Sequence, residues 1–95
     1  MGLFDFLKWK PKTSGGDGST PKTAVVINAT SSIVGIDVEY NWLASRYGTQ
    51  DKDWKLEIQA LREMDGRDFD VMTIRLKEGA MKTVYFDITS FYGKF

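Results

Sequence analysis

The chain has 95 residues, the size of a single domain, and its 13 basic and 13 acidic side chains give a formal net charge of zero. A neutral chain has no overall electrostatic attraction to nucleic acid or to an anionic membrane. It contains neither cysteine nor histidine, which excludes disulfides, thiolate metal sites and cysteine nucleophiles, and removes the usual general base and zinc ligand.

The first part of the chain is predicted to be a disordered tail over 1–21, followed by a single folded domain over 22–95. Residues 1–10, MGLFDFLKWK, are apolar with lysines near their end, but ten residues are too few for a helix that is stable alone in water. Residues 11–22, PKTSGGDGSTPK, have the composition of a flexible linker. We find no signal-peptide order and no run long enough to span a membrane, and therefore expect a cytoplasmic protein.

The domain begins with a short strand and a helix. The β-branched run over 24–27 predicts a strand over 22–28. The apolar period then becomes helical over 32–47, and Gly48 follows as a helix C-cap. The apolar stripe that we expect to face the core consists of Ile33, Ile36, Tyr40, Leu43, Ala44 and Tyr47.

The helix has a second apolar stripe on another side. Val34, Val38 and Trp42 recur every four residues, where a helix that covers one sheet should be polar. We expect this stripe to be covered by the N-terminal tail, by a curled sheet edge or by a second chain. The alternative is an exposed aromatic ring that lies on neighbouring side-chain stems.

Three later segments alternate apolar and polar residues with the period of two that is typical of half-buried strands. They predict strands over 53–63, 67–77 and 81–89, joined by turns that contain Gly66 and Gly79. Short connections favour an antiparallel meander. The register between the last two strands stays open, because several loop lengths fit equally well.

The first of these turns has two interpretations. A two-residue turn at Asp65-Gly66 mixes the apolar and polar faces, whereas a three-residue loop that starts at Met64 places Gly66 at the left-handed position. We predict the three-residue loop, because it sets apolar residues opposite one another. Its pairs are Trp54/Leu76, Leu56/Ile74, Ile58/Met72, Arg62/Asp68 and Glu63/Arg67.

A small apolar patch remains on the other face of this hairpin. Leu61, Phe69 and Val71 fall there, and Leu61 is predicted to oppose Phe69. The patch is either shielded by neighbouring lysine and arginine stems or available to a partner.

The polar residues near the turn predict no catalytic, cofactor or metal site. Glu63, Asp65, Asp68 and Asp70 lack the spacing and the closing glutamate of a calcium loop. No phosphate-binding glycine loop and no nucleophile–base pair can be named, so we do not expect an enzyme. Phe69 could lie on an open sheet face, but acidic residues share that face and make nucleic acid an unlikely partner.

The sequence therefore predicts a two-layer α+β domain with one helix packed on a four-stranded sheet. The order is strand, helix and three strands, of which the last three form an antiparallel meander. The position and direction of the first strand in the sheet stay open.

The function that we expect is a small non-catalytic binding or assembly module with a protein partner or a second copy as its target. One alternative is a peripheral membrane module anchored by residues 1–10, and another is nucleic-acid binding through the open sheet face. We expect no cofactor and no small-molecule ligand. The candidate interaction surface consists of Val34, Val38, Trp42, Leu61, Phe69 and Val71.

Overall fold

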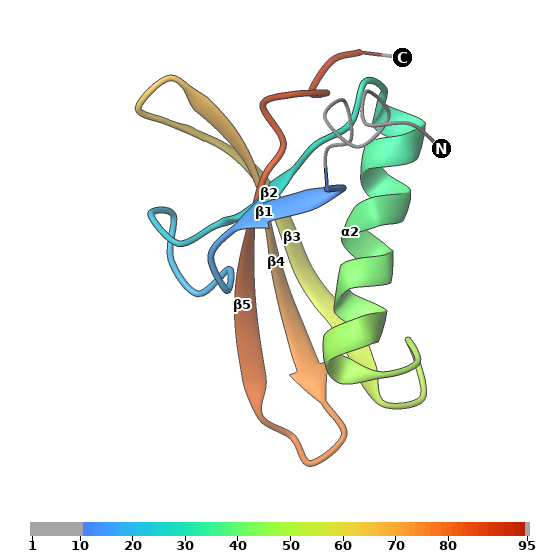
Figure 1. Cartoon of the computed structure of the whole chain (residues 1–95). Helices are drawn as coiled ribbons and strands as arrows, with labels where there is room; N and C mark the ends of the chain where they lie inside the picture. Colours follow the sequence, from blue (N-terminus) through green and yellow to red (C-terminus); the bar gives the residue numbers. More distant parts are fainter. Residues whose placement is uncertain (1–10, 95) are drawn as a thin grey trace, which may run out of the picture.

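The structure is a computed structural model that describes residues 11–94. Its elements are β1 (Thr13–Gly15), β2 (Val25–Ile27), α2 (Ser32–Tyr47), β3 (Trp54–Met64), β4 (Arg67–Leu76) and β5 (Met81–Asp87). The strands form one mixed sheet in the order β1-β2-β5-β4-β3, and α2 lies against one face of it (Figure 1). The α+β class and the antiparallel meander are confirmed. The predicted four-stranded sheet is wrong, because a fifth strand joins it.

The fifth strand, β1, comes from the segment predicted to be a linker. Thr13 pairs with Ile27 and Gly15 with Val25, antiparallel to β2. The backbone N–H of Asn28 extends the pairing by donating to the carbonyl of Lys12 at 2.9 Å. This strand has no apolar pattern of its own. It forms because β2 would otherwise leave a free edge of unpaired N–H and C=O groups.

The first predicted strand lies inside the sheet. β2 is parallel to β5, with Val25 opposite Phe86, so the direction that the sequence left open is parallel. β5 in turn is antiparallel to β4, with Met72 opposite Val84. The chain therefore leaves β2, crosses over through α2 to the far edge at β3 and returns through β4 to β5.

The β3–β4 hairpin uses two registers. Leu56 opposes Ile74 as predicted, but the pairing shifts between Leu56 and Ile58, and Ile58 opposes Thr73 instead of Met72. The predicted three-residue loop is wrong: Asp65 and Gly66 have φ of 53° and 76°, the positive values that a two-residue type I′ turn requires. A β-bulge supplies the one-residue offset between the two registers, so both ends of the hairpin pair without conflict.

The bulge reverses the faces of the second half of β3. Directly opposed residues point to the same side of a sheet, so Gln59, which opposes the buried Met72, faces the helix. Ile58 faces the other side and is 59 % exposed. The expectation that Ile58 belongs to the core is therefore wrong.

Helix α2 presents a different face to the sheet from the one predicted. Ser31 caps its first turn by accepting a hydrogen bond from the N–H of Val34 at 3.4 Å. Ile33 is 80 % exposed and Ile36 50 %, and Ala44 is exposed as well, so the predicted core stripe is wrong at these three positions. A Cβ at Gly35 would collide with the ring of Phe91, so the missing side chain allows this face to approach the C-terminal turn. The buried helix residues are Gly35, Val38, Glu39 and Leu43.

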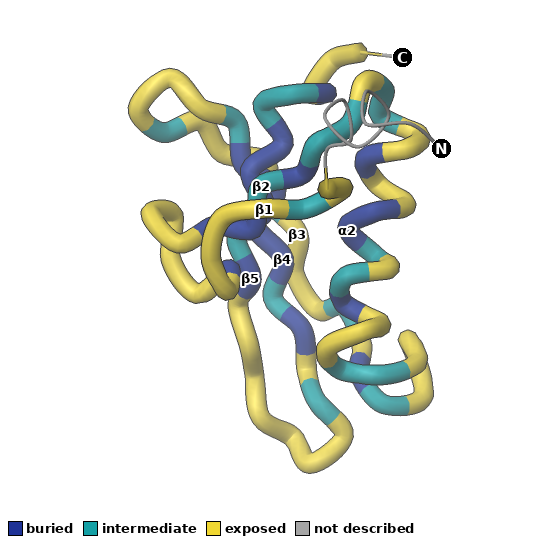
Figure 2. The backbone as a smooth tube through the Cα atoms, in the orientation of Figure 1, coloured by how far each residue is buried: buried dark blue, intermediate teal, exposed yellow. Residues whose placement is uncertain are grey.

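The main core lies between α2 and the sheet, and Figure 2 shows buried backbone concentrated there while the hairpin turns are exposed. Trp54 anchors it at one end by donating its Nε1–H to the carbonyl of Gly48 at 2.8 Å. A second cluster of Ala24, Phe69 and Val71 is buried separately from this core. No helix within residues 11–94 is long and apolar enough to cross a membrane.

Candidate binding cleft

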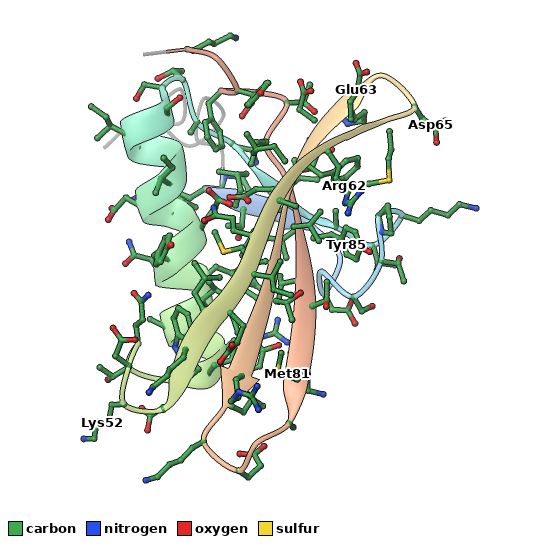
Figure 3. The ribbon with its side chains drawn as sticks, turned by 180° about the vertical axis from the view of Figure 1, so that it is seen from behind. Lys52, Arg62, Glu63, Asp65, Met81 and Tyr85 are labelled. Carbon is green, nitrogen blue, oxygen red and sulfur yellow. The ribbon has the colours of Figure 1, made fainter. Side chains whose placement is uncertain are left out.

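A cleft of about 800 Å³ opens between the N-terminal half of α2, the second half of β3 and the C-terminal turn over 89–93. It exists because β3 starts beside the C-terminal end of α2 and runs away from the helix towards Asp65 (Figure 3). The residues that line it are Ser32, Ile36, Glu39, Tyr40, Gln59, Leu61, Asp70, Ile88, Phe91, Tyr92 and Gly93.

The floor of the cleft is polar, and its two carboxyl groups are buried. Glu39 on α2 is 1 % exposed and Asp70 on β4 is 3 % exposed. The side-chain amide of Gln59 donates to both carboxyl oxygens of Asp70, at 3.1 and 2.9 Å. Oε2 of Glu39 is buried and receives no hydrogen bond from an N–H or O–H group of the described residues. The β-bulge is what brings Gln59 to this side of the sheet.

The two carboxyl groups are electrostatically coupled. Burial, a hydrogen bond with Asp70 and the charge of Asp70, in decreasing order of effect, together raise the pKa of Glu39 to about 10. Glu39 therefore keeps its proton at neutral pH, and the Glu39 O–H is the donor in the contact between the two carboxyls. Burial, followed by Asp70 and Glu39, also raises the pKa of the neighbouring Tyr40 hydroxyl. Such perturbed groups in a cleft are typical of functional sites.

The rim of the cleft is apolar and exposed. Ile36 is 50 %, Leu61 59 % and Tyr92 48 % exposed. The exposed apolar surface continues along α2 to Ile33 and Val34. Surface of this kind beside a polar pocket is the usual form of an interaction site.

The six residues of the predicted interaction surface do not form one surface. Leu61 lines the cleft and opposes Asp70, so its predicted pairing with Phe69 is wrong. Phe69 and Val71 are buried in the second cluster, on the other side of the sheet from Leu61. Phe69 is thus not free to stack on a base. Val34 is 48 % exposed, next to the apolar rim.

The other two predicted residues take part in core packing. Val38 is 5 % exposed. The half-buried ring of Trp42 meets Phe86 edge-on with 5.5 Å between ring centroids, and Arg46 lies 4.8 Å from the Trp42 centroid. Lys12 borders a groove of about 220 Å³ beside both residues. The rest of the N-terminal tail that was expected to cover this stripe is residues 1–10, which lie outside the described residues. The membrane anchor that we named as an alternative is the same segment.

Sequence reasoning missed the three floor residues Glu39, Gln59 and Asp70. Two of them carried a usable signal. Asp70 shares the inward face of β4 with Met72 and Ile74, and Glu39 lies on α2 between the two apolar stripes. Gln59 carried none, because its direction depends on the bulge. Within residues 11–94, no three acidic side chains are placed to hold a metal ion.

Comparisons of the chain with protein-family models, with curated proteins and with solved structures found no match.

Proposed function

We propose that the chain is a non-catalytic binding module that holds a segment of a partner protein in the cleft between α2 and β3. The observation that carries the proposal is the combination of a polar floor, in which the Glu39 and Asp70 carboxyl groups are buried and Gln59 donates to Asp70, with an exposed apolar rim. A concave apolar surface with a few convergent polar groups is the general form of a binding site, in which the apolar part supplies affinity and the polar part orientation.

The extent of the apolar surface favours a polypeptide over a small molecule. Ile33 and Val34 lie on α2 outside the cleft and extend its rim along the helix. A chain segment can cover both regions at once, with one side chain in the cleft and others along the helix. Catalysis is less well supported, because the Ser32 hydroxyl in the cleft lining donates to the carbonyl of Lys94 and is not paired with either carboxyl as a nucleophile with its base would be.

The test is a selection of binding peptides from a random displayed library, followed by affinity measurements on two matched variants. Leu61 and Ile58 are both 59 % exposed and both lie on β3, but they point to opposite faces of the sheet. We expect Leu61→Ser to weaken the selected peptides by about tenfold or more, since it removes apolar contact without adding charge to the cleft. Ile58→Ser should bind them as the unmodified chain does.

Two results would overturn the proposal: a library that yields no binder, or binders that tolerate Leu61→Ser. Thermal unfolding of both variants checks that they fold, and since Leu61 is exposed we expect little change in stability. Sedimentation of the free chain over a range of concentrations tests a second copy as the partner. Self-association that Leu61→Ser abolishes would identify the bound segment as part of another copy of this chain.

A further inference from the structure

Within residues 11–94, the floor of the cleft has two carboxyl groups and no lysine or arginine beside them. Among the eleven residues that line it there is no lysine or arginine. The ion pairs in residues 11–94 lie elsewhere, between Arg67 and Asp87 and between Arg75 and Glu57. Buried carboxyl groups in proteins are normally paired with a cation or saturated with hydrogen-bond donors.

The donors present do not saturate the floor. Glu39 and Asp70 offer four carboxyl oxygens, which face Gln59 from β3 and Tyr40 from α2. Gln59 donates only to Asp70, and Oε2 of Glu39 receives no hydrogen bond from an N–H or O–H group in the described part of the chain. A primary ammonium brings three donors and a guanidinium five, which is what this acceptor-rich floor lacks.

Aromatic rings around the floor point to the same ligand chemistry. Tyr40, Phe91 and Tyr92 line the cleft together with the two carboxyls. The face of an aromatic ring attracts a cation, and the attraction grows when the cation is withdrawn from water. Rings and carboxyls around one cavity thus suit an organic cation with an apolar stem.

We infer that the group held at the floor is an organic cation, a primary ammonium or a guanidinium, which lies between Glu39 and Asp70 with its stem along Leu61. This inference rests on the proposed function for the source of the cation, a lysine or arginine side chain of the partner segment. A free alkylamine has the same chemistry. When the cation enters, the carboxyl proton of Glu39 leaves to solvent, and the floor then holds two carboxylates and one cation. No covalent bond forms or breaks beyond this proton transfer.

The experiment has a peptide arm and an amine arm. In the first, each lysine of a selected peptide is replaced by norleucine and each arginine by citrulline, which keep the stem and remove the charge. We expect one such replacement to weaken binding by about tenfold or more. In the second, n-pentylammonium and pentan-1-ol are titrated separately into the ¹⁵N-labelled chain. We expect the ammonium alone to shift the side-chain amide signal of Gln59.

Calorimetry in two buffers of different ionisation enthalpy counts the protons released on binding. Near pH 7 we expect about one proton per bound cation. Glu39→Gln should release none and bind the cation more weakly, whereas Glu78→Gln, a change in an exposed turn, should behave as the unmodified chain does. Cation binding without proton release would overturn the inference.

The two proposals fail in different ways. Peptides that need Leu61 but tolerate loss of every basic side chain, together with no response to pentylammonium, would leave the binding module standing and refute the cation. Pentylammonium binding with proton release in a chain that selects no peptide would support the cation site and refute the protein partner, which identifies a free amine as the source.

Discussion

Replacing Glu39 by glutamine should stabilise the protein, and by more at higher pH. The folded chain holds the Glu39 proton up to a pKa of about 10, whereas the unfolded chain releases it near the ordinary value of 4.5. Between these values folding takes up a proton, so stability is full below the lower value and falls by about 1.4 kcal/mol per pH unit as the pH rises. Glutamine has nearly the same size, can donate to Asp70 and does not titrate. Near pH 7 the variant should therefore be more stable by up to about 3 kcal/mol.

The assay is urea unfolding followed by tryptophan fluorescence, which reports on Trp54 in the core. Between about pH 6 and about pH 8 the difference in unfolding free energy between Glu39→Gln and the unmodified chain should widen by roughly 3 kcal/mol. Glu78→Gln removes an exposed carboxylate and serves as the control. A difference that stays constant over this range would show that Glu39 does not keep its proton on folding, and would refute the account of the cleft floor.

Two further predictions concern the sheet. Ile74→Ala should lower the unfolding free energy by about 2–5 kcal/mol, since Ile74 is fully buried, whereas Ile58→Ala should lower it by less than about 0.5 kcal/mol; equal losses in urea titrations would refute the bulged register. Burial alone would raise the pKa of Asp87, but hydrogen bonds from Arg67 and Thr89 lower it overall. The stabilisation is present above the ordinary value of 3.8 and is lost as the pH falls through the lower, folded-state pKa, so the stability of Asp87→Asn should change less on acidification than that of the unmodified chain.

The sequence was sufficient for elements whose signals are local. Alternation predicted β3, β4 and β5, and the helical period followed by Gly48 predicted the bounds of α2. The strand β1 was not predictable in this way, because its polar residues pair only once β2 offers them an edge. The β-bulge after Leu56 could not be predicted from the sequence either. A one-residue offset leaves composition unchanged but turns every later side chain to the other face.

The helix face shows why the cleft escaped the sequence analysis. An apolar stripe is chosen on the assumption that apolar residues are inside, and α2 breaks that assumption: it buries Glu39 and exposes Ile36. The apolar period of the sequence does not determine how far the helix is rotated about its own axis, and so does not fix which face it presents to the sheet. The close approach that Gly35 allows to Phe91 is what selects the observed face.

The residues whose burial departs from the ordinary pattern cluster at the cleft, and this clustering is an argument for function. On α2, Glu39 is buried while Ile36 is exposed, and on β3 Leu61, on the same side of the sheet as Gln59, remains 59 % exposed. Both arrangements lower folding stability, since they bury a polar group or leave apolar surface in water. Proteins break local rules of this kind mainly at functional sites. All four residues line a single cleft, whereas the opposite end of the core, around Trp54, is apolar and fully packed. Stability alone would favour the reverse arrangement at the cleft, and the arrangement is therefore consistent with the proposed binding of a partner segment there.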